Sequence, residues 1–492
     1  QDLVGSSGPW DVLIVDEAHH LTDWSSDGSD PQQRMRLVRR LIGERLAPNG
    51  RVVLLTGTPH QGHRDRFVNL LKLLSGDEDA DGAMGRVIYR IKDDIRGWDG
   101  EPLFPIRQVN PHRVIPVPPE YHRWLEMVHG LLSPGIGASR ASGWRRATAL
   151  QWCASSPQAG LAFLVRLALR SGVTSQSSAP LQQAIAALRP YREGSEEEPL
   201  NVLEARLARP PAQDEIDTDE LFTGGRQRLE QVLELGVMLV REDVFGQKLS
   251  ALFALLDEAQ DEKLVVFAQP IETVYTLRRR LEQRLGPGAV ALIVGGQDQS
   301  VRKGEIARFV EQRHVRVLVS SRSGGEGINL QVARRLVHFD IPWNPMEMEQ
   351  RVGRVHRYGG AQTVLVDTFV LEGSREERVL ARARARLARI VTDLDRERVE
   401  LLFSRTMSLV PLDELAQLMA GESLGPLTPA EEDRLDHIVS EGYTQLQETD
   451  AEFRRRTMTL RTPEPGAVDF ADLESWMLRL GGASLADGWT RW

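Results

Sequence analysis

Apolar runs and helical periods alternate near the amino terminus of this 492-residue chain. Asp11–Val15 and Val52–Leu55 are short apolar runs that predict buried strands. Between them, apolar residues recur at helical spacing and stop at the turn-forming sequence Pro48-Asn49-Gly50; they are Met35, Leu37, Val38, Leu41, Ile42 and Leu46. The pattern predicts a parallel strand–helix–strand unit with a right-handed crossover.

The same alternation resumes at Lys263 and continues to Phe369. Apolar runs predict strands at Leu264–Phe267, Val290–Val294, Val315–Ser320, Leu336–Phe339 and Val364–Phe369. Helical stretches separate several of them, at Ile271–Leu285, Val301–Glu311 and Met346–Val352. Strands and helices in this rhythm predict a doubly wound α/β domain with a parallel sheet.

Two other regions have a helical pattern without strands. From about Pro111 to Val240, Leu, Ala, Arg and Trp recur at helical spacing, which predicts a helical insertion. After Glu372 the chain is rich in Arg, Glu and Leu, and we expect it to stay largely helical to its end. The expected units are a first α/β unit at residues 1–110, the insertion at 111–245, a second α/β unit at 246–372 and a helical carboxy-terminal region at 373–492.

Composition narrows the class of protein. The 61 basic and 70 acidic residues leave a net charge of −9, so any site for a polyanion has to be a local patch. Cys153 is the single cysteine, which excludes an internal disulfide and a cysteine-rich zinc module. No apolar run approaches the roughly 20 residues that cross a bilayer, and no signal pattern opens the chain. We expect a soluble, cytoplasmic protein with no membrane partner and, since residue 1 is Gln, a fragment or processed product.

Polar clusters follow both strands of the first unit. Asp16 and Glu17 come directly after the first strand, at the edge of an open sheet where ligands bind. One carboxylate there can hold a hydrated Mg²⁺ while the other orients or deprotonates a water for attack on a phosphate; an acidic pair that only caps the next helix is the alternative. Thr56-Gly57-Thr58-Pro59 follows the next strand and can hydrogen-bond to the acidic loop, although it is also a good turn.

Histidines near these clusters raise the alternative of a zinc site. They are His19, His20, His60 and His63. The spacing of the last two suits a zinc ligand pair, but cysteine partners are lacking and phosphate chemistry explains the acidic residues better.

Two segments of the second unit carry further candidate chemistry. Ser320–Leu330 combines hydroxyl side chains with three glycines, so its backbone can approach a phosphate or a sugar closely. In Gln350–Gly360, three arginines recur at helical spacing, and we expect them on one face of a helix; they are Arg351, Arg354 and Arg357. Like charges on one face require an anion or acidic residues opposite them, unless the face is simply solvated.

Taken in order, these segments resemble the motifs of the superfamily 2 helicase-like ATPases, specifically the bacterial branch of Swi/Snf-type translocases typified by RapA/HepA. Asp16-Glu17-Ala18-His19 resembles motif II, the DEAH box, and Thr56–Pro59 resembles motif III. Val265–Gln269 resembles motif IV, Gly324–Leu330 resembles motif V, and Gln350–Arg357 resembles motif VI. The stretch Asp340–Pro345 is typical of the Swi/Snf branch. The match covers Val12–Pro59 and Lys248–Phe369, less than half of the chain.

The resemblance implies two RecA-like lobes that bind ATP and Mg²⁺ between them. Asp16 would hold Mg²⁺ through water, Glu17 would position the attacking water, and Gln350 would help to orient the site. Arg354 and Arg357 would be arginine fingers from the second lobe, and Gly327 would contribute to nucleotide binding. Residues that couple the lobes would be His19, Thr56, Gly57 and Thr58. Residues that contact nucleic acid would be Ser320, Gly324, Gly325 and Asn329.

The chain departs from the family pattern in two places. No Gly-x-x-x-x-Gly-Lys-Ser/Thr sequence occurs, so we expect the phosphate-binding half of the first lobe to lie upstream in the gene product or on another polypeptide. A parallel sheet without its first strands would expose apolar edges. In addition, Arg357-Tyr358-Gly359-Gly360 replaces the usual Arg-x-Gly-Gln, which puts that glutamine contact in doubt.

The function that the resemblance implies is ATP-driven translocation on double-stranded DNA. A catalytically inactive scaffold or regulatory subunit is the alternative, and the paired arginines disfavour it because a scaffold has no physical need for them. Bacterial members of the family act in transcription recycling and in phage defence, including the DrmD component of DISARM systems. The long Arg-rich insertion favours a role in defence. The expected partners are proteins of a defence or transcription complex.

Overall fold

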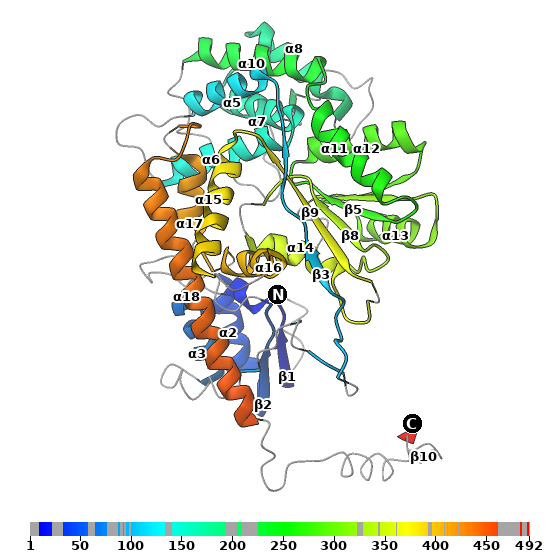
Figure 1. Ribbon diagram of the computed structural model, residues 1–492, viewed down its shortest axis with the longest axis vertical. Coiled ribbons are helices and arrows are strands. Elements are labelled where there is room, and N and C mark those ends of the chain that lie inside the picture. Colours follow the sequence, from blue (N-terminus) through cyan, green and yellow to red (C-terminus); the bar gives the residue numbers. More distant parts are fainter. Residues whose placement is uncertain are drawn as a thin grey trace.

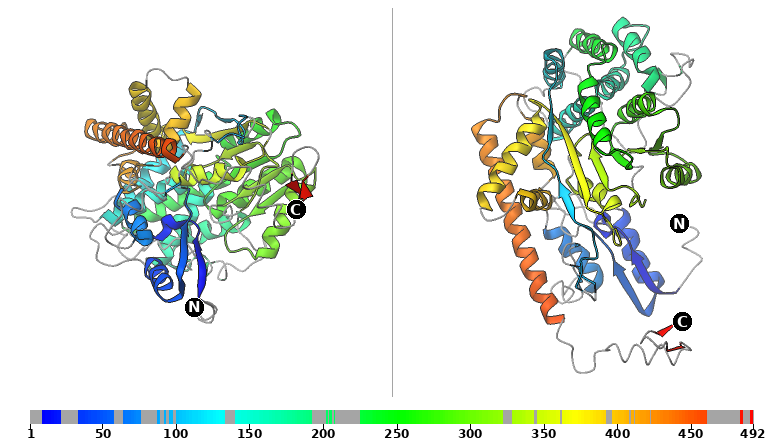
Figure 2. Two further views of the ribbon diagram at one scale, coloured as in Figure 1. Left: turned by 90° about the horizontal axis from the view of Figure 1, so that it is seen from below. Right: turned by 45° about the vertical axis from the view of Figure 1, so that its right-hand side comes forward.

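The computed structural model places most helices and strands of the chain around one large parallel sheet (Figures 1 and 2). The structure describes residues 9–21, 33–57, 64–75, 100–132, 140–191, 225–321, 328–342, 345–360, 362–391, 396–407, 412–421 and 423–460, with short pieces at 87–88, 92, 95–97, 202–207 in part, 409–410, 483–484 and 490–491. Among the described helices, none combines the length and the apolar character of a transmembrane span.

The amino-terminal unit consists of β1, α2, β2 and α3, drawn in blue beneath the large sheet in Figure 1. β1 (Trp10–Val15) pairs in parallel with β2 (Leu46–Leu54), and α2 (Gln33–Arg45) connects them. The predicted parallel strand–helix–strand arrangement is therefore confirmed. The predicted turn at Pro48–Gly50 lies inside β2, where a bulge interrupts its pairing with β1.

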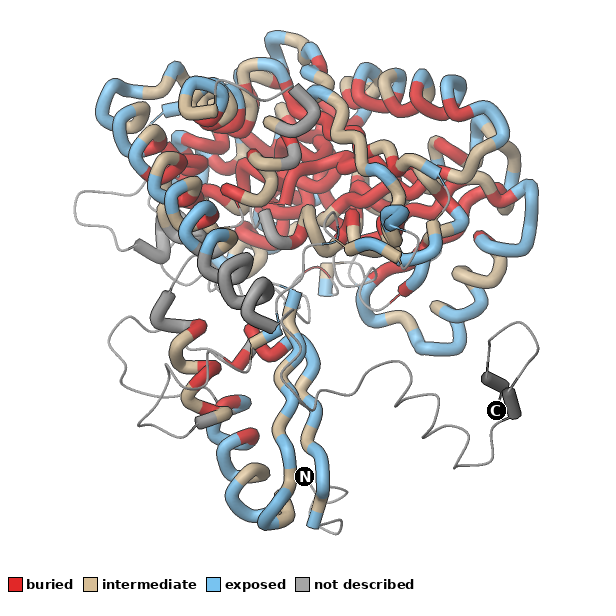
Figure 3. The backbone as a smooth tube through the Cα atoms, turned by 60° about the horizontal axis from the view of Figure 1, so that its bottom comes forward, coloured by how far each residue is buried: buried red, intermediate tan, exposed pale blue. Residues whose placement is uncertain are grey.

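The two faces of this small sheet differ in what covers them. On one face, Val15 and Leu54 pack against α2, α3 (Arg64–Ser75) and the turn after β1; the buried residues of this cluster are Ala18, Leu21, Met35, Val38, Leu70 and Leu73. On the other face, large apolar side chains at alternating positions are between 39% and 62% exposed; they are Val12, Ile14, Val53 and Leu55. Figure 3 shows that neither strand contains a buried residue. Parallel sheets are normally covered on both faces. Among the described elements, none covers this second face, and we call it the bare face of the unit.

The large sheet has the strand order β3-β9-β8-β5-β7-β6, with β4 also pairing to β9, and every pairing among these described strands is parallel. The strands are β3 (Arg107–Val109), β4 (Arg113–Ile115), β5 (Leu264–Phe267), β6 (Val290–Ile293), β7 (Val317–Ser320), β8 (Arg335–His338) and β9 (Val364–Leu371). All residues of β5 to β8 are buried. The predicted α/β fold with a parallel sheet is confirmed.

Two strands of this sheet have no counterpart in the sequence prediction. β3 and β4 have three residues each, too few to show a period. Both pair with β9, although the boundary predicted at residue 110 falls between them. The helices that flank the strands of the second lobe are α11 (Gly246–Glu258), α12 (Ile271–Leu285), α13 (Gln299–Glu311) and α14 (Pro345–Val355).

The helical insertion packs directly on the large sheet and shares its core. Its helices are α5 (Pro119–Leu131), α6 (Arg140–Ser155), α7 (Pro157–Arg170), α8 (Ala179–Leu188) and α10 (Arg226–Arg241), at the top of Figure 1. One cluster of buried apolar residues extends from Trp124 in α5 to Val266 and Val337 in the sheet. α6 and α7 approach closely at Gly160, where a Cβ atom would lie 2.4 Å from the Trp124 ring and 2.6 Å from Cys153 Sγ.

The carboxy-terminal region is helical up to Leu460. Its helices are α15 (Arg375–Ile390), α16 (Arg396–Met407), α17 (Leu412–Ala420) and α18 (Pro429–Leu460). Arg382 joins α15 to α18 through ion pairs with Glu432 at 3.1 Å and Asp436 at 2.8 Å. Beyond α18 the described residues form two short antiparallel strands, β10 (Ala483–Ser484) and β11 (Thr490–Arg491), within the region that the sequence predicts to be largely helical. Gly481-Gly482 directly precedes β10, and glycine disfavours helix.

Candidate functional site

The turn after β1 places two carboxylates at the end of the strand. Asp16 and Glu17 are both exposed, and Asp16 Oδ1 accepts a hydrogen bond from the Glu17 backbone N–H at 2.8 Å. Glu17 has a φ of 49°, in the left-handed region that costs non-glycine residues free energy. Such strained positions cluster at functional sites. The turn holds both acidic side chains at the edge of the sheet, where the sequence predicted them.

His19 connects this turn to the end of β2. Its side chain is buried, and its Nδ1 lies 3.0 Å from Thr56 Oγ1 and 3.2 Å from Glu17 Oε2. A backbone hydrogen bond supports this contact: the Ala18 N–H donates to Leu55 O at 2.9 Å and holds the segment after β1 next to the segment after β2. A contact between Nδ1 and a carboxylate requires a proton on Nδ1. The structure therefore brings together Glu17, His19 and Thr56, which the sequence placed in two separate motifs.

The glycine-rich segment after β7 is described only at its two ends. Gly324, Gly325 and Gly327 lie outside the described residues, as does Thr58 after the exposed Gly57. Ser320 is fully buried at the end of β7, and its hydroxyl donates to Ser321 O at 3.1 Å. The Ser320 side chain is thus not exposed at this position, and its contact with nucleic acid stays a prediction.

Asn329 lies at the other end of that segment and is exposed. Its Oδ1 accepts from the Gln331 N–H at 3.2 Å, and its Nδ2 donates to Gln331 Oε1 at 2.9 Å. Gln331 Nε2 in turn donates to Tyr358 O at 2.8 Å. The exposed end of the segment is thus linked to the chain just beyond α14.

α14 and the residues after it carry the candidate groups of the second lobe. Gln350, Arg354 and Arg357 are all partly exposed. Arg354 O accepts from the Leu330 N–H at 2.9 Å, which joins the helix to the end of the glycine-rich segment. Arg357 Nε donates to Gly353 O at 3.0 Å.

Arg351 differs from the other two arginines. Its side chain is buried, its guanidinium carbon lies 5.5 Å from the centre of the Phe267 ring, and its NH1 donates to Asp340 O at 3.3 Å. The prediction that all three arginines share one helix face is wrong. Arg351 is buried, Arg354 is partly exposed, and Arg357 lies beyond the end of α14 at Val355.

An ion pair fixes the middle of α14 to the neighbouring strand. Arg107 of β3 donates to both carboxylate oxygens of Glu349 at 2.8 Å, and the Ser404 hydroxyl of α16 donates to the same group. Burial alone would raise the pKa of Glu349, but the charge and hydrogen bonds of Arg107, with the bond from Ser404, outweigh it and lower the pKa to about 2. Glu349 is therefore a permanent anion that joins α14 to β3 and α16.

The connection between the amino-terminal unit and β3 holds the end of α14. Lys92 Nζ donates to His356 O at 3.0 Å, and His356 Nε2 donates to Pro105 O at 2.8 Å. Lys92 also lies 5.6 Å from the centre of the Phe104 ring. Sequence reasoning missed these contacts, since Lys92 belongs to no recognisable motif and its partner is 264 positions away.

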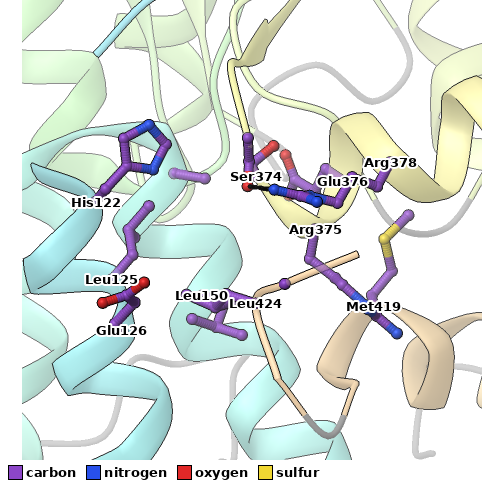
Figure 4. A pocket seen from close by; sticks show the side chains of 13 residues that line it. His122, Leu125, Glu126, Leu150, Ser374, Arg375, Glu376, Arg378, Met419 and Leu424 are labelled. Carbon is purple, nitrogen blue, oxygen red and sulfur yellow. Dashed lines mark hydrogen bonds between the residues drawn. The ribbon is translucent and has the colours of Figure 1, made fainter. Parts of the chain in front are cut away.

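A cavity of about 140 Å³ lies elsewhere, where α5 and α6 of the insertion meet α15 and the segment after α17 (Figure 4). Its described lining includes none of the predicted site residues. Arg375 on its wall is buried, donates to Leu418 O at 2.8 Å and pairs with Glu431. The cavity therefore belongs to the junction of insertion and carboxy-terminal helices.

Comparison with known proteins places these segments in a family. Residues 247–359 match the Helicase conserved C-terminal domain. RNA polymerase-associated protein RapA of Vibrio parahaemolyticus is 26% identical over 404 residues, which cover 76% of this chain and 36% of that protein. The uncharacterized ATP-dependent helicase YqhH of Bacillus subtilis is 33% identical over 120 residues, 24% of this chain and 21% of that protein. These matches support the resemblance to the Swi/Snf-type, helicase-like ATPases of superfamily 2, in the RapA branch.

The family match lies within the second lobe. The Helicase conserved C-terminal match spans β5 to β8 and α14, the second lobe of the predicted architecture. The Sulfolobus solfataricus SWI2/SNF2 ATPase core in complex with dsDNA is similar in structure, with 18% identity over 84% of this chain and 72% of that chain, at a TM-score of 0.32. The chain spans about a fifth to a third of the length of the two curated relatives named above.

Proposed function

We propose that this protein is part of an ATP-driven motor that moves along double-stranded DNA and hydrolyses ATP between its two lobes. The observation that carries the proposal is the exposed acidic turn at Glu17, which His19 joins to Thr56 at the ends of two parallel strands. The family supports an ATPase, since the relative YqhH is described as an ATP-dependent helicase. Double-stranded DNA follows from the resemblance to Swi/Snf-type translocases.

In this proposal, each candidate residue has one task. Glu17 orients the attacking water and accepts its proton. His19 couples a change in the charge or position of Glu17 to Thr56, because its Nδ1 contacts both side chains. Arg354 and Arg357 stabilise the charge that develops on the γ-phosphoryl group, and Gln350 helps to orient them. Both arginines are partly exposed, as groups that meet a nucleotide from across a cleft must be.

The donor chemistry at the turn fits Mg²⁺ bound to ATP. Mg²⁺ prefers hard oxygen ligands, keeps several waters, and is usually held by one or two carboxylates together with substrate phosphates. Asp16 offers an exposed carboxylate beside the exposed carboxylate of Glu17. When bound, the metal would neutralise phosphate charge; Asp16 would hold it through water.

We further propose that a polypeptide segment carrying the phosphate-binding loop covers the bare face of the amino-terminal sheet. Val12, Ile14, Val53 and Leu55 form an apolar surface that a parallel sheet normally buries. The occupant would be the other half of the first lobe, in the same gene product or on a second chain. The 492-residue chain alone should accordingly bind ATP poorly and hydrolyse almost none; calorimetry that finds micromolar affinity for it would contradict this part.

The net charge of the chain and the names of its relatives indicate how it would bind nucleic acid and which proteins it would bind. With a net charge of −9, duplex binding requires a local cationic track, and its affinity should fall steeply with salt and depend little on sequence. Asn329 and the glycine-rich segment before it would contact the DNA backbone. Relatives named RNA polymerase-associated protein support a transcription complex as partner; a role in phage defence stays a prediction from the sequence.

Glu17→Gln in the full-length protein tests the proposal. The variant should bind ATP and fail to turn it over, because it cannot accept the proton of the attacking water. Glu44→Gln is the matched control: it removes an exposed glutamate of the same unit, paired with Arg40 at 3.0 Å, and should hydrolyse ATP normally. Wild-type turnover in Glu17→Gln would contradict the assignment. Absence of turnover in the wild type, with every nucleic acid and partner supplied, would favour the inactive scaffold.

A further inference from the structure

A buried polar cluster lies where the helical insertion meets the second lobe. Its centre is Asp340, only 4% exposed, in the segment between β8 and α14. Asp340 Oδ2 accepts from Ser155 Oγ at 2.7 Å and from the Gln269 N–H at 2.8 Å. The carbonyl of Asp340 accepts from Arg351 at 3.3 Å. One residue thus contacts the insertion, the segment after β5 and α14.

The insertion contributes the junction of α6 and α7 to this cluster, and we call this junction the corner. Ser155 ends α6, and Ser156 caps α7, where its hydroxyl accepts from the Ala159 N–H at 3.1 Å. Both serines are fully buried, and both hydroxyls lie 2.8 Å from Thr273 Oγ1 in the first turn of α12. A corner without an intervening loop cannot absorb movement of its helices, so displacement of α6 or α7 moves Ser155.

A buried lysine stabilises the same corner. Lys248 Nζ donates to Ala154 O at 3.0 Å and to Ser155 O at 3.1 Å, the last carbonyls of α6, and lies 4.5 Å from the centre of the Phe339 ring. Burial lowers the pKa of Lys248 to about 8, against the opposing charge of Asp340. The corner is therefore tied to α11 by charged groups as well as by packing.

The other side of the cluster is α14. Arg351 NH1 lies 3.8 Å from Asp340 Oδ1, and the Arg351 side chain covers the Phe267 ring. Gln269, which donates its N–H to Asp340, also donates its side-chain amide to Glu347 Oε2 in the first turn of α14, at 3.0 Å. Asp340 therefore holds α14 at two places, directly at Arg351 and through Gln269 at Glu347.

We infer that Asp340 is a positioning residue through which the helical insertion sets the orientation of α14, and with it Arg354 and Arg357. The hydrogen bond from Ser155 is the link that carries the position of the insertion to Asp340. Anything that shifts α6 against α7, such as a nucleic acid or protein bound to the insertion, would change turnover without touching the nucleotide. The effect on turnover rests on the proposed ATPase function, whereas the structural link does not.

The structural link is tested by hydrogen–deuterium exchange of the 492-residue chain with Ser155→Ala. Loss of one buried hydrogen bond should speed amide exchange in α14 about fivefold. Ser178→Ala is the matched control, because Ser178 is another buried serine of the insertion; it caps α8, where its hydroxyl accepts from the Leu181 N–H at 3.4 Å. Ser178→Ala should leave α14 unchanged. Unchanged exchange of α14 in Ser155→Ala, or equal acceleration in both variants, overturns the inference.

The consequence for turnover is tested in the full-length protein. Ser155→Ala should lower the kcat for ATP about fivefold, while the KM for ATP and the affinity for duplex DNA stay at the values of Ser178→Ala. Faster exchange in α14 with an unchanged kcat would refute the link to turnover. If the wild type hydrolyses no ATP, the proposed function fails, and the exchange experiment still decides whether Asp340 transmits the position of the insertion.

Discussion

The amino-terminal unit and the second lobe are both built on parallel strands, but only one of them is closed. β5 to β8 are buried at every position, between helices of the second lobe and of the insertion. β1 and β2 have helices on one face and exposed apolar side chains on the other. The second lobe is thus closed on both faces, whereas the amino-terminal unit has its candidate residues on a sheet of which the described elements cover only one face.

The candidate chemistry is divided in the same way. The amino-terminal unit holds Glu17 in a strained, exposed turn with one buried histidine behind it. The second lobe holds Arg354 on α14 and Arg357 just beyond its end, and α14 is fixed by Asp340 and by Glu349. A closed lobe can position long arginine side chains accurately, since each of their supports is itself buried or paired.

Arg357→Ala tests this division with the largest expected effect. Loss of an arginine finger should reduce DNA-stimulated ATP hydrolysis by about 10³ to 10⁵ in the full-length protein. Duplex affinity should persist, because in the proposed mechanism this arginine faces the nucleotide and not the DNA. Steady-state ATPase assays and DNA titrations measure the two quantities, with Arg313→Ala, an exposed arginine of the second lobe, as control. Loss of DNA binding with basal hydrolysis retained would make this arginine part of a nucleic-acid surface.

Glu349→Gln tests how firmly the second lobe holds α14. The pKa of Glu349 falls from 4.5 to about 2 on folding, so its ionised form contributes about 3 kcal/mol to stability at pH 7. Because this pKa is lowered, the contribution is present above about pH 4.5 and disappears as the pH falls toward 2. Urea unfolding should show a large gap between wild type and variant at pH 7 that narrows from pH 5 to pH 3. A gap independent of pH would contradict the ion pair with Arg107.

A pair of valines compares the two sheets directly. Val266 in β5 is fully buried, and Val53 in β2 is 39% exposed. Val266→Ala should cost about 2 kcal/mol or more because it leaves a cavity, whereas Val53→Ala should cost less than about 1 kcal/mol in this chain. Urea dependence of hydrogen exchange in each strand measures both. Equal losses of stability in the two variants would mean that the face of Val53 is already covered. A larger loss for Val53→Ala in the full-length protein than in this chain would support the proposed covering segment.

The smallest expected effect concerns an exposed ion pair of the amino-terminal unit. Arg40 and Glu44 are paired at 3.0 Å on α2, with side chains 71% and 55% exposed. Since such pairs contribute about 0.3–0.5 kcal/mol, Arg40→Ala should shift the urea midpoint slightly, and added salt should remove the difference. A loss comparable to that in Glu349→Gln would show that this helix surface is buried in an assembly.

Pattern reasoning succeeded where an element is decided by its own residues. Leu264–Phe267 and Ile271–Leu285 have the same bounds in the prediction and in the structure. The continuous apolar runs of the second lobe mark strands buried on both faces, and strong periods mark helices with one buried face. The runs Asp11–Val15 and Val52–Leu55 were wrongly predicted as buried, since β1 and β2 contain no buried residue. Asp16 and Glu17 could be assigned to a strand end for the same reason. β3 and β4 could not be predicted, because three residues that gain stability only by pairing with β9 have no pattern of their own.

The arrangement of the α14 arginines shows the limit of such reasoning. Their spacing identified a helix with cationic side chains, but helical geometry and the partner Asp340 decided that Arg351 turns inward. Likewise, nothing near Ser155 in the chain indicates a role, since its partner Asp340 is 185 positions away. Strands, helices and motif chemistry depend on neighbouring residues and can be inferred locally. Burial, ion pairing and the link between insertion and α14 depend on distant segments, which only the packed core brings within hydrogen-bonding distance.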